Sequence, residues 1–421
     1  MGSWREYRCS VCGRAYTSEE VTYVCPEDGG NLDVILDYDA IRASWTPGKI
    51  ASSRDTSIWR YLPLLPVGDP GHAGTPLHAV GWTPLFAPPV LAEKLGLEKL
   101  YLKDEGRNPT ASFKDRASAV AVARAQEIGT DVIVTASTGN AGAALAGMAA
   151  AANMPAVILA PKTAPPAKIA QLLIFGARVI LVDGTYDDAF DLTLEAADAF
   201  GWYCRNTGYN PFTAEGKKTA AFEIAEQYSA AVGWTDDATW QTPDAVFVSV
   251  GDGNIISGLH KGFKDLKELG WIDRIPRIFG IQSTGSAAIY NAFAAGTEDI
   301  QPVQADTKAD SISVDLPRDG LRALRAATQT GGAYVAVPDE AIIAAISDLG
   351  RDAAVFAEPA GATAYAGLLA ALEQNLVRPD ESILVLNTGN GLKDIKAAME
   401  AAGEAQVIEP ELDALKAALN A

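Results

Sequence analysis

A regular alternation of short β-rich runs with amphipathic helical patterns begins near residue 97 and continues to the C-terminal region. Apolar strands that alternate with helices are typical of parallel α/β sheets. In such sheets ligands bind beyond the carboxyl ends of the strands, in the loops that lead into the helices. We expect strands at 100–103, 132–135, 156–159, 179–182, 245–250, 278–282, 334–337 and 383–386, and helices at 116–128, 167–175, 187–200 and 219–228.

Composition narrows the classes of function. The 421 residues suffice for two packed domains, and 48% are hydrophobic, so a large core can be buried. The 34 Lys and Arg against 53 Asp and Glu give a net charge of −19, which disfavours nucleic acid as a partner. The most apolar stretch, 141–160, is rich in Ala and Gly and interrupted by Asn153 and Pro155, so we expect no membrane span. Four cysteines and an N-terminus without an apolar signal core predict a cytoplasmic protein.

The first forty residues differ from the rest of the chain. They hold three of the four cysteines together with turn residues, which predicts a small ribbon resembling a zinc ribbon over 1–40. Residues 41–421 then form the main body.

One lysine stands at a helix start in the segment NPTASFKDR, 108–116. Lys114 follows an expected strand and precedes an expected helix, and a helix N-terminus disfavours a positive charge. Its amine therefore suits attack on a carbonyl, although a first-turn lysine that merely reaches solvent is the common alternative.

Three further loops follow expected strands. ASTGNAG at 136–142 offers hydroxyls and backbone N–H groups to an anion such as a carboxylate, and VGDGNIIS at 250–257 suits a phosphate. The second loop is no dinucleotide fingerprint, because Ile256 stands where a third glycine is needed. LNTGNGLKD at 386–394 places the Thr388 hydroxyl at a strand end, where it can bond a ring nitrogen. Each loop alone could be an ordinary turn with a helix cap. Together they indicate a cofactor with an aldehyde, a phosphate and a ring nitrogen, which describes pyridoxal 5′-phosphate.

The segments SFKDR, ASTGNAG, EGKKT, GDGNIISG, EPAGA and TGNGLKD, in this order, resemble the threonine synthases of the tryptophan-synthase-β-like group. The resemblance implies two parallel-sheet domains, a mobile smaller α/β subdomain at about 116–210, and a homodimer. It also implies that Lys114 holds the cofactor covalently, that Asn140 bonds the ring hydroxyl and that Thr388 faces the pyridine nitrogen. The cofactor phosphate would lie on Gly251, Asp252, Gly253, Asn254 and Ile255, and Ser137 and Thr138 would grip the substrate carboxylate.

The implied reaction converts O-phospho-L-homoserine and water into L-threonine and phosphate. The sequence departs from the family pattern before EGKKT, where 208–214 contain no arginine to bind the substrate phosphate. We therefore expect another cation there, with Arg107 the first candidate and Lys103, Lys217 and Lys218 the others, against the alternative that each is a solvated surface charge.

The cysteine cluster departs from a four-cysteine ribbon as well. Cys9, Cys12 and Cys25 are followed by Asp28 where a fourth thiolate would stand. Three thiolates and one carboxylate can hold zinc, and the alternative is a ribbon that has lost its metal.

Other functions use the same motifs. A Ser/Thr dehydratase or a β-replacement enzyme resembling cysteate synthase would need the same Lys114 and Thr388. A non-catalytic protein on a decayed scaffold is disfavoured by the intact motifs, and a nicotinamide oxidoreductase by the broken fingerprint.

Overall fold

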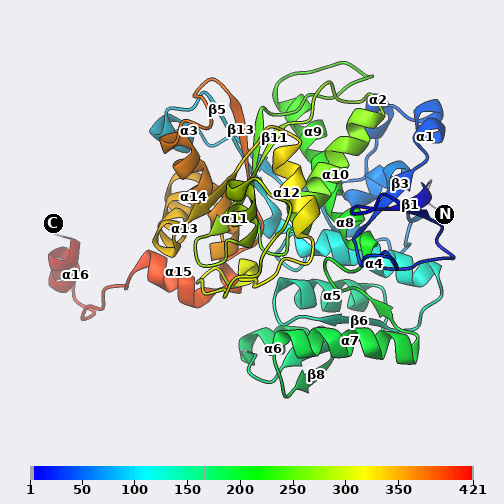
Figure 1. Cartoon of the computed structure of the whole chain (residues 1–421). Coiled ribbons are helices and arrows are strands. Elements are labelled where there is room, and N and C mark those ends of the chain that lie inside the picture. The colour runs from blue at the N-terminus through cyan, green and yellow to red at the C-terminus, as the bar shows by residue number, and fades with distance from the viewer. Residues whose placement is uncertain (1–3, 165, 420–421) are drawn as a thin grey trace.

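Three sheets organise the protein, which is described here from a computed structural model of residues 4–164 and 166–419 (Figure 1). The N-terminal ribbon is antiparallel, with strand order β2-β1-β3. Its strands are β1 (Trp4–Cys9), β2 (Ala15–Tyr16) and β3 (Leu32–Leu36).

The largest sheet has six strands in the order β12-β11-β10-β13-β5-β4, and all neighbours are parallel except β4 and β5. Its central strands β10 and β13 are buried along their whole length, as parallel strands covered on both faces should be. The strands are β4 (Leu85–Phe86), β5 (Lys99–Asp104), β10 (Ala245–Ser249), β11 (Arg277–Ser283), β12 (Tyr334–Val337) and β13 (Ser382–Asn387).

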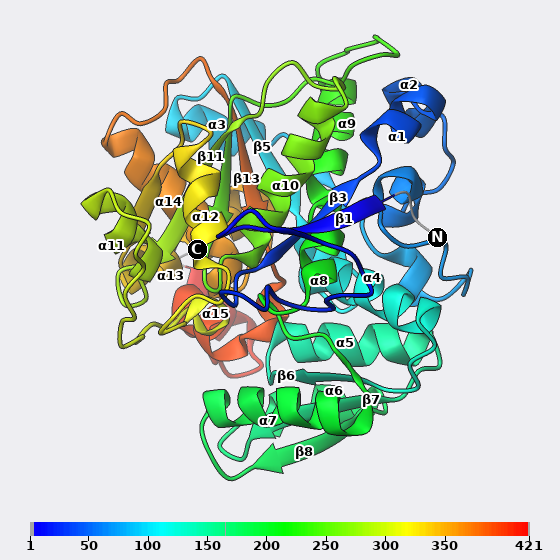
Figure 2. The ribbon, with the colours of Figure 1, turned by 45° about the vertical axis from the view of Figure 1, so that its right-hand side comes forward.

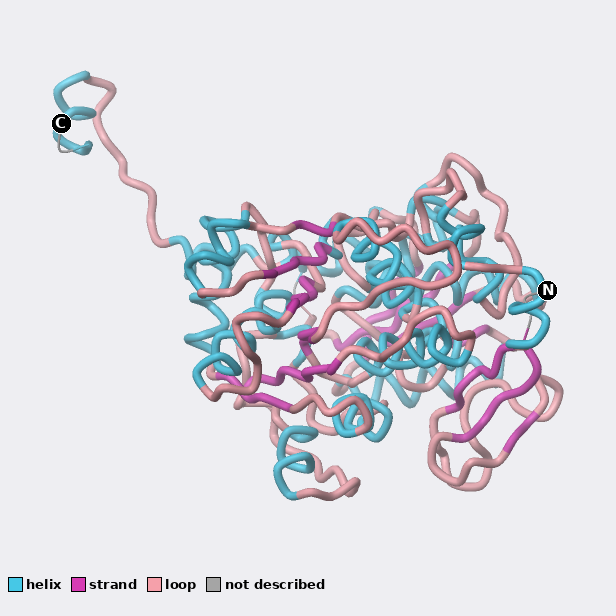
Figure 3. Tube along the Cα trace, turned by 90° about the horizontal axis from the view of Figure 1, so that it is seen from above, coloured by secondary structure: helices cyan, strands magenta, loops and turns pink. Residues whose placement is uncertain are grey.

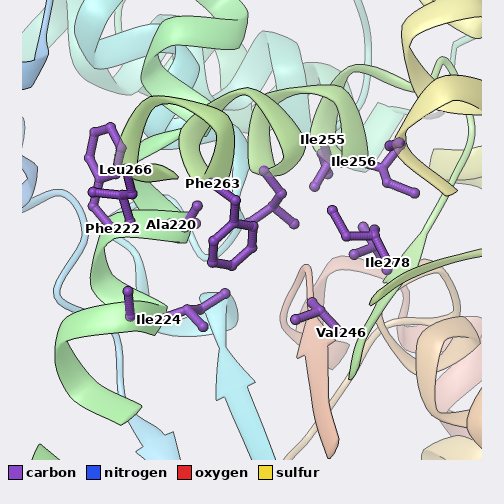
Figure 4. Close-up of a cluster of buried hydrophobic side chains, with 14 of the residues drawn as sticks. Ala220, Phe222, Ile224, Val246, Ile255, Ile256, Phe263, Leu266 and Ile278 are labelled. Carbon is purple, nitrogen blue, oxygen red and sulfur yellow. The ribbon is translucent and has the colours of Figure 1, made fainter. Parts of the chain in front are cut away.

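Alternate side chains of β10 enter two different cores. Val246 and Val248 pack with residues of α9 (Thr219–Ala231) and α10 (Asn254–Glu268), a cluster drawn in Figure 4. Ala245 and Phe247 pack instead with residues of α13 (Asp339–Ala353) and α14 (Pro359–Glu373). This period of two places helices on both faces of the sheet.

A second, four-stranded parallel sheet has the order β8-β7-β6-β9 and lies below the large sheet in Figure 2. Helices α5 (Asn140–Ala151) and α6 (Pro166–Ile174) pack against this sheet in one hydrophobic cluster. Helix α7 (Tyr186–Phe200) packs against it in a second hydrophobic cluster. The strands are β6 (Ile133–Ala136), β7 (Ala156–Pro161), β8 (Arg178–Val182) and β9 (Tyr203–Cys204). The two sheets confirm the predicted α/β class with parallel sheets.

Helices α4 (Lys114–Glu127) and α8 (Pro211–Lys217) cross closely between the two parallel sheets (Figure 1). A Cβ on Gly216 would lie 2.1 Å from the carbonyl oxygen of Arg116, so glycine is required at this crossing. The close packing fixes the start of α4.

The remaining helices complete the body. They are α1 (Tyr38–Ser44), α2 (Pro47–Ala51), α3 (Pro89–Leu95), α11 (Ala288–Ala295), α12 (Gly320–Thr328), α13 (Asp339–Ala353), α14 (Pro359–Glu373), α15 (Ile395–Ala402) and α16 (Leu412–Leu419), with 3-10 turns η1 (Ile58–Leu64), η2 (Pro76–Ala79), η3 (Glu105–Arg107), η4 (Asp310–Ile312) and η5 (Gly391–Lys393). Helix α16 extends away from the body (Figure 3). Among the described residues, no helix has the length and hydropathy needed to cross a bilayer.

Candidate active site

A cavity of about 640 Å³ collects the loops that follow β6, β10 and β13 together with the first residue of α4. These loops leave the carboxyl ends of strands in both parallel sheets, where ligands of such sheets bind. The lining includes the sequence-predicted residues Lys114, Ser137, Thr138, Asn140, Lys217, Gly251, Asp252, Gly253, Asn254, Ile255 and Thr388.

Lys114 is the first residue of α4 and lies against the cavity. Burial lowers the pKa of its ammonium below the ordinary value, because a charged amine loses hydration there, and Arg205 lowers it further. The Glu358 carboxylate acts in the opposite direction. The net effect favours the neutral amine, which is the nucleophilic form.

The loop after β6 brings Ser137, Thr138 and Asn140 to the cavity wall. A Cβ on Gly142 would lie 2.4 Å from the Ser137 carbonyl oxygen, so the chain turns tightly into α5. The Asn140 side-chain amide donates to Glu358 Oε1 at 2.7 Å. Asn140 is thereby held at the helix start with its side chain buried.

Glu358, to which the sequence assigned no role, lies beside this cavity and lines a neighbouring pocket together with Asn140. It stands at the N-cap of α14, in the segment EPAGA, and is buried. Burial raises the pKa of its carboxyl to about 7, with Lys114 as the main opposing influence. Glu358 can therefore exchange a proton near neutral pH beside Asn140.

The loop after β10 turns directly into α10, whose first residue is Asn254. Gly253 adopts φ +89°, and a Cβ there would lie 2.6 Å from the Ala323 Cβ, so only glycine fits. No side chain caps α10, and the first-turn N–H groups of a helix lack intrahelical partners. This arrangement suits a phosphate.

Thr388 follows β13 and is buried at the cavity wall. Its carbonyl oxygen accepts a hydrogen bond from the Phe113 N–H at 2.9 Å. This hydrogen bond connects the loop after β13 to the residue before Lys114. It therefore holds Lys114 and Thr388, the two residues predicted to contact the cofactor aldehyde and ring nitrogen, close together.

Three of the proposed substrate-phosphate cations are not brought to the cavity. The side chain of Arg107 is 60% exposed and pairs with Asp104, because the 3-10 turn η3 directs it to the surface. Lys103 and Lys218 are buried, but each is neutralised by carboxylates, Glu223 in the first case and a Glu215–Asp265 pair in the second. Of the four candidates, Lys217 alone lines the cavity.

Arg205 lines the cavity as well, although the sequence analysis did not select it. It follows β9, and its side chain is fully buried. The only signal in the sequence is an arginine after a short apolar run, which is too common to single out.

The cysteine ribbon also assembles as a group. The ligand atoms of Cys9, Cys12, Cys25 and Asp28 all lie within 4.8 Å of one another. The predicted four-residue set is therefore close enough to share one ion.

Comparison with known proteins separates the family from its alternatives. The family described as "Pyridoxal-phosphate dependent enzyme" matches residues 77–389. The threonine synthase of Methanocaldococcus jannaschii is 40% identical over 98% of this chain and 99% of its own length. That of Methanosarcina acetivorans is 37% identical over 98% of both chains. The chain belongs to the threonine synthases.

Solved structures agree on the fold. The processed form of threonine deaminase isoform 2 from Solanum lycopersicum matches with a TM-score of 0.65 and 26% identity, over 86% of this chain and 93% of that chain. O-ureido-L-serine synthase matches with a TM-score of 0.65 and 18% identity, over 82% and 99%, and so supports the fold alone.

The residues of the cavity fit pyridoxal 5′-phosphate. A lysine with a lowered pKa can bind its aldehyde, the start of α10 can hold its phosphate, and the Thr388 hydroxyl is a neutral partner for its ring nitrogen. The chain is therefore a pyridoxal-phosphate-dependent lyase.

Proposed function

We propose that the protein converts O-phospho-L-homoserine and water into L-threonine and phosphate. The observation that carries this is the full-length similarity to threonine synthases, combined with a cavity that brings Lys114 to the predicted anion loops. Bound pyridoxal phosphate would act as an electron sink for carbanions. In the overall reaction the bond between the γ-carbon and the phosphate oxygen breaks and phosphate leaves with its electron pair. The β-carbon loses a proton and gains the hydroxyl of water, so one proton comes from the β-carbon and one from water. One of these two protons goes to the γ-carbon and the other to the departing phosphate.

We assign to the residues the roles that the resemblance to threonine synthases implies, and their places around the cavity support these roles. Nζ of Lys114 would hold the cofactor, and its lowered pKa suits the neutral amine to accept the substrate's α-proton. Asn140 would contact the ring hydroxyl and Thr388 the ring nitrogen, since both residues line the cavity. Ser137 and Thr138 bind the substrate carboxylate.

The cofactor phosphate is proposed to lie on the loop from Gly251 to Ile255. This loop runs into α10 and lines the cavity. The N–H groups there need no side chain to bind an anion, which explains why residues as different as Asp252 and Ile255 occur in it.

The smaller domain, proposed at about 116–210, would close on the substrate. It carries the Ser137–Thr138 loop, whereas Thr388 and the phosphate loop belong to the large sheet. Closure would bring the carboxylate-binding loop to the substrate and exclude water until it is needed.

A substrate panel tests the reaction against the alternatives. The purified holoenzyme would be incubated separately with O-phospho-L-homoserine, O-phospho-L-serine, L-serine and L-threonine, and the products identified by NMR. We expect the highest kcat/KM for phosphohomoserine with threonine as product. If the main activity forms an oxo-acid from serine or threonine, the protein is a dehydratase. If the main activity is β-replacement on phosphoserine, the protein is a β-replacement enzyme resembling cysteate synthase.

We also propose that Cys9, Cys12, Cys25 and Asp28 hold one zinc ion. Tetrahedral zinc with ordinary bond lengths separates two sulfur ligands by about 3.8 Å and sulfur from oxygen by about 3.5 Å. The Sγ atoms of Cys12 and Cys25 lie 3.8 Å apart, and Cys9 Sγ lies 3.3 and 3.6 Å from the two Asp28 oxygens.

The backbone supports these ligands. The Val11 N–H donates to Cys9 Sγ at 3.3 Å, and the Gly30 N–H donates to Asp28 Oδ1 at 2.8 Å. A Cβ on Gly30 would lie 2.7 Å from Cys9 Sγ, so glycine leaves the room that the cluster needs. Such outer contacts fix the orientation of metal ligands.

Metal analysis tests the zinc proposal. Protein expressed with added zinc should contain about one zinc per chain by elemental mass spectrometry, and Asp28→Ala should lower the content, whereas Asp69→Ala on the main body should not. A metal-free wild-type protein of unchanged stability in chelator would instead favour a ribbon that folds on its own packing.

A homodimer and a cytoplasmic location complete the proposal. Helix α16 has no buried residue, and Leu412, Leu415 and Leu419 are exposed on it, so a second copy of the chain is proposed to cover this helix. The four cysteines are free, which suits a reducing compartment. Light scattering should give a dimer that the double change Leu412→Asp and Leu415→Asp weakens; a monomeric wild type would contradict it.

A further inference from the structure

Buried cations in this protein are nearly always paired with carboxylates. Among the residues that the structure describes, eight Lys and Arg side chains are buried, and six of them have a carboxylate oxygen within 4.0 Å. The two without one are Arg205 and Lys217, and both line the active-site cavity. Burial lowers the pKa of Lys217 well below its ordinary value, and an anion beside it would favour the charged form again. A cavity lined by two cationic side chains without carboxylate partners therefore suits anionic ligands.

Lys217 belongs to the cofactor side of this cavity. Its Nζ donates to Asn254 Oδ1 at 2.5 Å, and Asn254 is the first residue of α10 in the predicted phosphate loop. Asp319 holds the other end of the same amide at 2.7 Å. Lys217 is therefore placed to support the cofactor phosphate, which leaves Arg205 for a second anion.

Arg205 lies in the cavity wall, and one of its three donor nitrogens has no hydrogen-bond partner among the described residues. Its Nε donates to Ser118 Oγ at 3.2 Å and its Nη1 to Thr207 Oγ1 at 2.6 Å. Its Nη2 is buried and has no hydrogen-bond partner among the described residues. Burial lowers the pKa of the guanidinium to about 10, and Tyr186, Cys204, Asp115 and Asp252 oppose this only in part.

The N-terminal ribbon holds both ends of the Arg205 segment. The Tyr23 hydroxyl accepts a hydrogen bond from the Cys204 N–H at 2.9 Å. The Asn31 side-chain amide donates to the Gly208 carbonyl oxygen at 2.5 Å. Arg205 and Thr207 are thus fixed in place before any ligand arrives, which lowers the cost of binding.

We propose that Arg205, together with the Thr207 hydroxyl, binds the phosphate group of the substrate. The proposal rests on the proposed function, since it assigns the phosphate of an O-phosphorylated amino acid to this site. Residues 208–214 contain no arginine, and Arg205, which directly follows β9, would take over the binding of the substrate phosphate. Because Nε and Nη1 are already engaged, Nη2 offers the phosphate a charge-assisted hydrogen bond, and the Thr207 hydroxyl can donate a second one.

Inorganic phosphate is the probe that tests the site in the holoenzyme. Its dissociation constant would be measured by isothermal titration and by the shift in unfolding temperature with added phosphate. We expect Arg205→Met to weaken binding at least tenfold and to abolish the thermal shift, and Arg205→Lys to restore part of both. Arg107→Met, which alters an exposed arginine outside the cavity, should bind phosphate as the wild type does.

Kinetics then connect the site to the substrate. Arg205→Met should lower kcat/KM for phosphohomoserine about 30- to 500-fold, the loss expected when one partner of a buried charge pair is removed. Spectral binding of L-threonine, which has no phosphate, should change less than threefold. Equal losses for both ligands, or phosphate binding that survives in Arg205→Met, would overturn the assignment.

Two further outcomes are distinguishable. If Arg205→Met fails to fold, Thr207→Val carries the test, and unchanged phosphate affinity in that variant would overturn the proposal. If the wild type makes no threonine yet binds phosphate through Arg205, the proposed function fails while the anion site stands.

Discussion

Arg116, the arginine of SFKDR, lies two residues after Lys114 and offers the strongest structural test in this part of the chain. It is fully buried in the first turn of α4. Its guanidinium donates to both oxygens of Glu105 at 2.7 and 2.8 Å and to both oxygens of Glu223 at 2.6 and 2.7 Å. Lys103 also contacts Glu223 at 2.8 Å, so two cations balance two carboxylates in a closed cluster.

Arg116→Met keeps most of the side-chain volume and removes the charge. Glu223 would keep Lys103, but Glu105 would have no cation within 4.0 Å among the described residues. Breaking a buried pair by removing one partner costs about 3–5 kcal/mol. We expect the free energy of unfolding to fall by that amount.

Equilibrium urea unfolding, followed by circular dichroism and tryptophan fluorescence, measures the loss. Adding Glu105→Gln to Arg116→Met removes the stranded carboxylate and should restore about 1–2 kcal/mol. Arg378→Met, whose side chain is 67% exposed in its ion pair, is the control and should change stability by about 0.5 kcal/mol or less. A loss below about 1 kcal/mol in Arg116→Met would refute the view that this cluster anchors the start of α4.

Three further changes test single groups. Thr388→Val should keep the cofactor through dialysis yet lose most activity; loss of cofactor with activity intact on resupply would contradict the role proposed for its hydroxyl. Glu358→Gln should remove a transition near pH 7 from the pH profile of kcat, because burial raises the pKa of that carboxyl to about 7; an unchanged profile would assign the transition elsewhere. Burial lowers the pKa of His260 to about 3, below the ordinary 6.5, so its contribution to stability is present above pH 6.5 and is lost as pH falls. Between pH 6.5 and 5 the wild type should lose about 2 kcal/mol more than His260→Phe in urea unfolding, and equal losses would refute the shift.

Much of the site could be predicted because parallel strands end on the same edge of a sheet. Lys114 and Thr388 lie far apart in sequence, yet β5 and β13 are neighbours and their following loops meet at the Phe113–Thr388 hydrogen bond. The glycine pattern also predicted the turn into α10, because Gly253 adopts a left-handed backbone conformation that favours glycine. At these positions, the residue types and their places after the strands were sufficient to predict the loops around the cavity.

The sequence could not predict which cationic side chain lines the cavity and which faces solvent. Arg107 and Arg205 are the same residue type after a strand, and whether each guanidinium points to solvent or into a cavity depends on a 3-10 turn in one case and on packing against α4 in the other. Strand β9 has two residues, too few for a period to be recognised. Glu358 acquires its role through contact with Asn140, which is remote in sequence.

Oxygen tracing tests the central claim, that this cavity makes threonine by cleaving the bond between carbon and oxygen. The holoenzyme would be incubated with O-phospho-L-homoserine in ¹⁸O-labelled water, and both products analysed by mass spectrometry. The account predicts L-threonine that carries one ¹⁸O and an equal amount of phosphate that carries none. Labelled phosphate with unlabelled homoserine would show cleavage of the phosphorus–oxygen bond and contradict the account.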